Sequence, residues 1–182
     1  AAPSSAAALR ALRASTIYGS LTAEGSLVSF DEVDDPERRD GIVAAYEQSG
    51  GRPPAAGVAV FEVEPVDVVT YPWEWPNSLL ESAAQLTLDL RMRLLSVGLD
   101  LKDASAFNVQ FRGMIPVFID LGSVEAWRPN PSWNASRQFI EHSVQILARQ
   151  RQEHARRDRT DGDVGRLVRN QICFAEEFAF GK

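Results

Sequence analysis

Cysteine and lysine are almost absent from this chain of 182 residues. Cys173 is the only cysteine, which excludes an internal disulfide and makes a reducing cytoplasm the expected compartment. Lysine occurs only at Lys102 and Lys182, so few positions can supply a catalytic lysine. The net charge of −6 argues against nucleic acid as the main partner, because proteins that bind nucleic acid usually carry a basic face.

Long apolar runs are also missing. No stretch approaches the roughly 20 apolar residues that a membrane-spanning helix needs, and residues 1–15 lack the continuous hydrophobic segment of a secretory signal. We therefore expect no membrane association. A content of 45% hydrophobic and 24% charged residues is ordinary for a globular protein, and the length allows one domain or two small lobes.

The first part of the chain predicts a small α+β lobe over residues 16–70, preceded by a flexible lead or short helix over residues 1–15. The expected elements of the lobe are a strand at Ser26–Phe30, a helix at Pro36–Gln48, and a strand pair at Val58–Val63 and Val66–Tyr71. The helix is favoured because Pro36 lies in its first turn and Asp34 and Asp35 can cap it. The strand pair is favoured by its β-branched and aromatic residues.

Residues 71–76 predict a rigid, hinge-like connector, because two prolines fix the backbone and three aromatic residues offer contact area. Residues 77–182 predict a mainly helical lobe. Its expected elements are a helix from a Ser78–Glu81 capping box to about Val97, a polar loop, a hairpin of Val109–Phe111 with Ile115–Ile119, a second long helix opening at Asn130–Pro131, a charged stretch at Arg149–Arg159, and an apolar tail at Val164–Phe180.

The polar loop carries the most informative pattern in the chain. Asp103 is followed five residues later by Asn108, and Asp120 ends the second strand of the hairpin. Kinase-like folds place a catalytic Asp, an Asn and a metal-binding Asp in this order. In such a fold Asp103 would orient or deprotonate an acceptor hydroxyl, while Asn108 and Asp120 would hold Mg²⁺ against nucleotide phosphates.

The order of the elements agrees with this interpretation. A lobe containing strands, a connector, a long helix, a polar loop, a hairpin and a helix is the order of a kinase-like fold. We therefore predict an α+β, protein-kinase-like fold with two lobes, a reduced N-lobe and a helical C-lobe. Tyr71 and Trp73 would lie at the hinge, where they are candidates for contact with a ligand, although packing in the hinge is an alternative role for Trp73.

Structural roles for the same residues remain open. Asn108 and Asp103 are residue types that bridge loop backbone or cap turns, and Asp120 could pair with an arginine such as Arg112. The sequence also departs from an active kinase. The first 70 residues contain no lysine and no Gly-x-Gly-x-x-Gly loop, and Arg52 beside Gly50–Gly51 is a poor substitute for a phosphate-binding lysine.

A more specific resemblance covers approximately residues 16–140 and is strongest from Tyr71 to Ser123. The segments that carry it are Tyr71–Trp75, Leu101–Gly113, Pro116–Ser123 and Gln138–Phe139. They resemble the N-terminal, kinase-like region of a bacterial family described as class I S-adenosylmethionine-dependent methyltransferases or as nodulation-protein-like. The family resemblance implies a following Rossmann-type methyltransferase domain, but this chain has no strand followed by a glycine-rich turn. S-adenosylmethionine is therefore expected only where a further domain or partner is present.

Other catalytic schemes have less support. His142 and His154 lie twelve residues apart, which does not suit ligation of a metal from one helix face, so both are expected to be solvated. Cys173 lies in an apolar tail and is expected to be a core thiol.

Three functions follow in order of preference. The first is an accessory, pseudokinase-like domain of a methyltransferase-type protein that binds a small molecule or a Mg²⁺-nucleotide such as ATP in the interlobe cleft. The second is a catalytically inert scaffold that holds a partner protein through the apolar tail. The third is an active small-molecule phosphotransferase.

Overall fold

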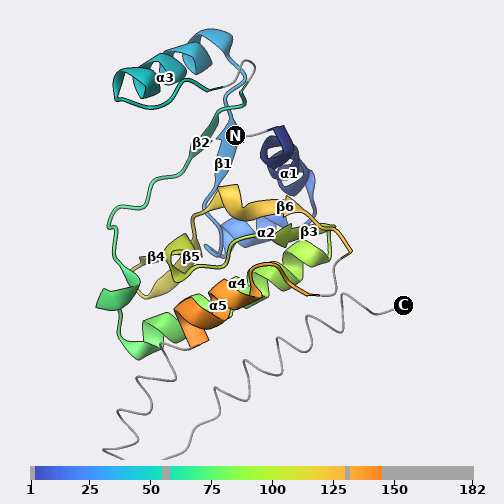
Figure 1. Cartoon of the computed structure of the whole chain (residues 1–182), viewed down its shortest axis with the longest axis vertical. Coiled ribbons are helices and arrows are strands. Elements are labelled where there is room, and N and C mark those ends of the chain that lie inside the picture. Colours follow the sequence, from blue (N-terminus) through green and yellow to red (C-terminus); the bar gives the residue numbers. More distant parts are fainter. Residues whose placement is uncertain (1–2, 55–57, 130–131, 145–182) are drawn as a thin grey trace, which may run out of the picture.

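The computed structural model describes residues 3–54, 58–129 and 132–144, and its architecture is α+β, as predicted (Figure 1). The helices are α1 (Pro3–Ala14), α2 (Tyr18–Ala23), α3 (Pro36–Gln48), α4 (Asn77–Leu95) and α5 (Ser136–Phe139). The strands are β1 (Phe30–Glu32), β2 (Phe61–Val63), β3 (Leu99–Leu101), β4 (Val109–Arg112), β5 (Ile115–Phe118) and β6 (Val124–Ala126). Short 3₁₀ turns occupy Pro72–Glu74, Ala106–Asn108 and Leu121–Ser123, and a π-helical turn covers Ile140–Val144.

Helix α4 forms the centre of the core. Leu80, Leu90 and Leu94 are fully buried on its apolar face and belong to one cluster that includes residues of the hairpin β4–β5 and of β3. The helix was predicted well, but the Ser78–Glu81 capping box was wrong. The N-cap is Pro76, and Ser78 already lies within the first turn, where it cannot cap the helix.

The described strands form three antiparallel pairs, β1–β2, β3–β6 and β4–β5. The hairpin β4–β5 is the one predicted, with Val109 opposite Phe118 and Gly113 in the left-handed region at its turn. The strand expected at Ser26–Phe30 lies instead at Phe30–Glu32, and Leu27 forms an isolated parallel bridge to Phe118.

The predicted pairing of Val58–Val63 with Val66–Tyr71 is wrong. Strand β2 pairs with β1, and residues 66–71 form no strand. At Thr70 both backbone polar groups are taken by one side chain: Gln110 Oε1 accepts from Thr70 N at 2.8 Å, and Gln110 Nε2 donates to Thr70 O at 2.9 Å. Thr70, the residue before the connector, is therefore attached to β4 by a buried side chain. Its backbone N–H and C=O are then not available for pairing with a neighbouring strand.

At the amino end, residues 3–14 form a packed helix, which excludes the flexible-lead alternative for them. Leu9 and Leu12 are buried, and α1 contacts β6. Arg10 forms an ion pair with Glu32 of β1, so α1 also touches the strand pair. The predicted first-lobe helix is confirmed as α3, whose N-cap Asp35 accepts from Glu37 N at 3.0 Å.

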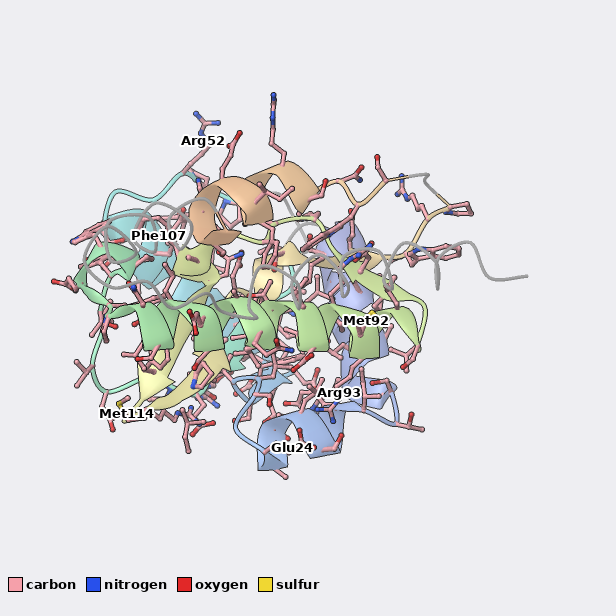
Figure 2. All side chains as sticks on the ribbon, turned by 90° about the horizontal axis from the view of Figure 1, so that it is seen from below. Glu24, Arg52, Met92, Arg93, Phe107 and Met114 are labelled. Atoms are coloured by element: carbon pink, nitrogen blue, oxygen red, sulfur yellow. The ribbon has the colours of Figure 1, made fainter. Side chains whose placement is uncertain are left out.

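The first lobe is poorer in strands than predicted, because β1–β2 is the only pair in its described part. Helix α3 has no buried residue and lies at one end of the molecule, away from α4 (Figure 1). Arg93 of α4 forms an ion pair of 2.6 Å with Glu24, just after α2 (Figure 2). The two short N-terminal helices thus pack with the second half of the chain.

The predicted opening of the second long helix, Asn130–Pro131, lies outside the described residues. Helix α5 begins at Ser136, and Trp133 before it is held in place because its Nε1 donates to Leu101 O at 2.7 Å. The stretches Arg149–Arg159 and Val164–Phe180, together with His154 and Cys173, lie outside the described residues. No described helix is both long and apolar enough to cross a membrane.

Candidate functional site

The polar loop lies between two pairs of strands that fix its ends. Strand β3 pairs with β6, and Lys102 N donates to Ser123 O at 2.9 Å just beyond that pair. At the other end the 3₁₀ turn Ala106–Asn108 passes directly into β4. Ile119 N donates to Asn108 O at 2.8 Å, so the hairpin register brings Asn108 next to the residue before Asp120. Local pairing therefore brings together residues that are twelve positions apart.

Asp103 and Asn108 are joined directly. Asn108 Nδ2 donates to Asp103 Oδ1 at 2.9 Å, and Ser105 N donates to the same oxygen at 2.9 Å. The Asn108 side chain is buried, while Asp103 is partly exposed. The turn-capping role that was an alternative for Asp103 is therefore real, and it orients the carboxylate within the loop.

Asp120 is the N-cap of the 3₁₀ turn that follows β5. Gly122 N donates to its Oδ1 at 2.9 Å, and a Cβ at Gly122 would lie 3.0 Å from that oxygen, so a side chain there would crowd the carboxylate. Burial raises the pKa of Asp120, and the negative charge of Asp103 raises it further, against the lowering effect of the Gly122 bond and of Lys102. The Asp103 carboxylate therefore lies close enough to Asp120 for its negative charge to disfavour ionisation of Asp120.

Each of the three side chains uses one polar atom to hold itself in place. Asp103 and Asp120 accept protein bonds through Oδ1, and Asn108 donates through Nδ2. No hydrogen bond recorded among the described residues uses Asp103 Oδ2, Asn108 Oδ1 or Asp120 Oδ2. One oxygen of each side chain is thus left without a protein hydrogen bond among the described residues.

The described part of the chain contains no group of three or more His, Cys, Asp and Glu side chains that could hold a metal. A site made by Asp103, Asn108 and Asp120 would consist of two carboxylates and one amide oxygen. That donor set fits Mg²⁺, which prefers oxygen ligands and is usually bound by one or two carboxylates together with phosphates of the substrate. It does not fit zinc, which is bound mainly by Cys and His.

His142 was expected to be solvated, and this is wrong. Its Nδ1 lies 2.9 Å from Ser105 Oγ, and the Ser105 hydroxyl is buried in the middle of the polar loop. Phe107 N donates to the same Oγ at 3.3 Å. The sequence carries no local signal for this contact, because 37 residues separate the two partners.

Four rings lie in a row beside the loop. Tyr71 and Trp73 stack with ring centroids 4.8 Å apart, Trp73 meets Phe107 edge-on at 5.6 Å, and Phe107 meets His142 edge-on at 6.4 Å. Trp73 is 70% exposed, whereas Trp75 is buried. The two aromatic residues proposed for ligand contact therefore stack on each other, and the row that they begin reaches the polar loop through Phe107.

Two of the structural alternatives can be decided. Among the described residues Arg112 pairs with Glu64 and not with Asp120. Arg112 Nη2 lies 3.1 Å from Glu64 Oε1. Arg52 is exposed, and the described residues before Tyr71 contain no lysine. In the described part of the chain, residues 3–54 and 58–70 therefore lack the lysine that holds the nucleotide phosphates in an active kinase.

Comparison with known proteins adds one relative. The chain is similar to the nodulation protein NoeA of Rhizobium meliloti (strain 1021), with 34% identity over 137 residues. The matched part is 75% of this chain but only 26% of the relative, so the chain spans about a quarter of that protein's length. No family model matches the chain. No solved structure matches it either.

The comparison supports the nodulation-protein-like part of the resemblance found in the sequence. It does not reach the methyltransferase or kinase-like parts, which stay predictions. This chain is thus similar to one segment of a nodulation protein.

Proposed function

We propose that this chain is a kinase-like accessory domain of a methyltransferase-type protein and that it binds a Mg²⁺-nucleotide or a related phosphate-bearing small molecule. The observation that supports the proposal is that Asn108 Nδ2 donates to Asp103 Oδ1 at 2.9 Å and that the Asp103 carboxylate lies close enough to Asp120 to raise its pKa. Asn108 and Asp120 would hold Mg²⁺, which would neutralise phosphate charge when bound. Asp103 would orient a hydroxyl of the ligand.

The surroundings of the loop support the same function. Lys102 lies close enough to Asp120 to lower its pKa, and its exposed ammonium group is available to a phosphate. The exposed rings of Tyr71 and Trp73 could contact an apolar or planar part of the ligand. With no lysine in the described first lobe, binding is favoured over phosphoryl transfer.

A second candidate is an inert scaffold of the same fold. It is favoured by exposed apolar side chains in the connector and just before it, because Val68, Val69 and Trp73 are 63%, 65% and 70% exposed. A protein partner would cover such a surface. An active phosphotransferase is the third candidate and the least favoured.

Isothermal titration separates these candidates. We expect Mg²⁺-ATP to bind the wild-type chain, ATP with EDTA to bind at least tenfold more weakly, and Asp120→Asn to lose the Mg²⁺-dependent part. Because Mg²⁺ relies on ligand phosphates to complete its shell, Mg²⁺ alone should bind weakly. Phosphorylation of an added acceptor would favour the phosphotransferase.

The control is Asp40→Asn, which removes an exposed carboxylate from α3, far from the loop in sequence. It should leave Mg²⁺-ATP binding unchanged. S-adenosylmethionine should give no heat with this chain alone. If Mg²⁺-ATP also gives none with the wild type, the cation site is wrong and the scaffold stands.

A further inference from the structure

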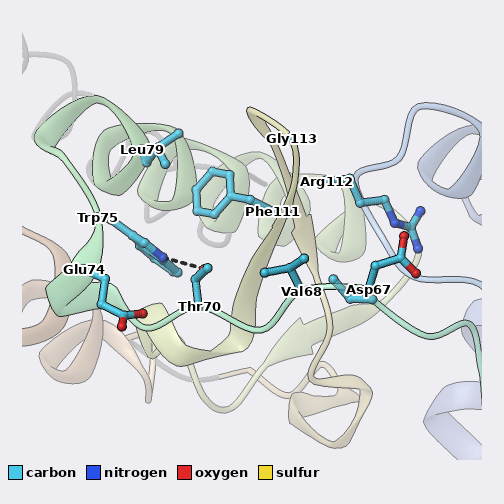
Figure 3. Close-up of a pocket in the computed structure, with 10 residues that line it drawn as sticks. Asp67, Val68, Thr70, Glu74, Trp75, Leu79, Phe111, Arg112 and Gly113 are labelled. Carbon is cyan, nitrogen blue, oxygen red and sulfur yellow. Dashed lines mark hydrogen bonds between the residues drawn. The ribbon is translucent and has the colours of Figure 1, made fainter.

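A separate pocket of about 540 Å³ lies between the connector, the start of α4 and the hairpin β4–β5 (Figure 3). The pocket is lined by Thr70 and by Glu74 and Trp75 of the connector. Its other side is lined by Phe111 and Arg112 of β4. None of Asp103, Asn108 and Asp120 lines it. Its volume lies within the range of small-molecule sites, which is about 300–1,000 Å³.

The walls are apolar and held in place. Trp75 and Phe111 meet edge to face at 4.9 Å, with Leu79 and Val68 completing the apolar lining. Trp75 Nε1 donates to Thr70 Oγ1 at 2.9 Å, and Thr70 is itself bound through its backbone to Gln110. The pocket is therefore formed before any ligand enters, which lowers the entropy cost of binding.

The charged groups lie at opposite ends. In Figure 3 Glu74 lies beside Trp75 and Thr70, whereas Asp67 and Arg112 lie at the far end of the pocket. Arg112 Nη2 is 3.1 Å from Glu64 Oε1, although the angle does not make a hydrogen bond, and the atom is buried. The positive charge of Arg112 is thus already paired, and that nitrogen is out of reach of a ligand.

Glu74 is a carboxylate at one end of the pocket whose orientation is fixed. Its Oε2 accepts from Tyr71 N at 2.7 Å, which fixes the carboxylate. No ion pair to Glu74 is recorded in the described residues. A fixed carboxylate beside aromatic walls is complementary to an organic cation.

We propose that this pocket binds a small molecule that joins an apolar body to a protonated amine. The amine lies at Glu74, and the body lies between Leu79, Phe111 and Val68. The site is distinct from the polar loop and does not rest on the proposed function.

Three matched probes test the charge preference by isothermal titration: phenethylamine, phenethyl alcohol and hydrocinnamate. The amine should bind with a Kd on the order of 1 mM, as expected for a small fragment, and the other two at least tenfold more weakly. Equal binding of the alcohol, or tighter binding of the acid, would overturn the proposal. So would the absence of binding by the amine.

Two substitutions test the position. Glu74→Gln keeps an acceptor for Tyr71 N but removes the charge, so it should weaken the amine about five- to tenfold. Val68→Trp at the exposed wall should fill the pocket and abolish binding. Glu62→Gln, an equal loss of charge outside the pocket, should leave binding of the amine unchanged. If Asp67→Asn weakens the amine and Glu74→Gln does not, the assignment of the amine to Glu74 is wrong.

Discussion

The carboxylate of Asp120 carries a charge that its surroundings disfavour. Burial raises its pKa, and so does the neighbouring Asp103 carboxylate. A group whose pKa is higher in the folded than in the unfolded chain stabilises the fold when it is protonated, and this contribution is lost as the pH rises through the folded pKa. Ionisation of Asp120 above its folded pKa therefore lowers the stability of the fold relative to the protonated form.

We predict that Asp120→Asn is more stable than the wild type at pH 7. Each kcal/mol gained would raise the Tm by about 2–4 °C for a chain of this size. The difference should disappear as the pH falls below the ordinary Asp pKa of about 4, where both proteins are neutral at this position. Thermal unfolding of the two proteins between pH 3.5 and 8 measures the difference in Tm. The other carboxylates are the same in both proteins, so their contributions to the pH dependence cancel.

Asp40→Asn is the control, because this exposed residue should change stability by no more than about 0.5 kcal/mol at any pH. If Asp120→Asn is less stable than the wild type at pH 7, the carboxylate of Asp120 stabilises the fold and the prediction is wrong.

At the scale of the elements, a buried ion pair joins α4 to β3 immediately before the polar loop. Arg91 Nε lies 2.8 Å from Asp100 Oδ1, and the side chains of the two residues are 5% and 15% exposed. The Arg91 guanidinium also lies 4.3 Å from the ring centroid of Trp133, which in turn bonds to Leu101 O. The consecutive elements α4 and β3 thus meet Trp133, which lies more than 30 residues further along the chain.

Asp100→Ala is expected to destabilise the chain by about 3–5 kcal/mol, because it leaves the Arg91 charge buried without its carboxylate. The double variant Arg91→Met with Asp100→Leu should recover most of that loss. Urea unfolding measures both. Asp40→Ala breaks the exposed Arg39–Asp40 pair and should cost less than about 1 kcal/mol. If Asp100→Ala also lowers the free energy of unfolding by less than about 1 kcal/mol, the Arg91–Asp100 pair does not stabilise the fold as predicted.

For the whole molecule, burial is distributed unevenly. Helix α4 has nine buried residues, whereas α3 has none and is attached through contacts such as the exposed pair of Arg38 with Glu62. Local opening requires least energy where few apolar contacts are lost. The end of the molecule with α3 should therefore open independently of the core.

Hydrogen exchange should show this difference directly. We expect amides of α3 to exchange at least about a hundredfold faster than those of the middle of α4, which corresponds to about 2.7 kcal/mol. Mg²⁺-ATP should slow exchange in residues 102–122 and leave α3 unchanged. Equal protection of the two helices would contradict the uneven distribution.

Much of the local structure could be predicted from the sequence. The helix at Pro36–Gln48 follows from an Asp cap and a proline in its first turn, and the hairpin follows from β-branched strands around Gly113. The spacing of Asp103, Asn108 and Asp120, with the helix before them and the hairpin after, indicates a candidate site, and this stays a prediction. The contact of His142 with Ser105 and the failed pairing of residues 66–71 could not be predicted, because each depends on a side chain about 40 residues away.

The sequence by itself determined the elements whose signals lie within a few residues: caps, helical periodicity, turn glycines and the order of the polar side chains. Only the tertiary structure decided which segments became partners, including β2 with β1, Arg91 with Asp100 and Trp133, and Glu74 with the pocket. The physical reason is that a local signal acts through a few neighbouring dihedral angles. Partners are chosen by burial and hydrogen bonding across the whole core, where many apolar segments compete.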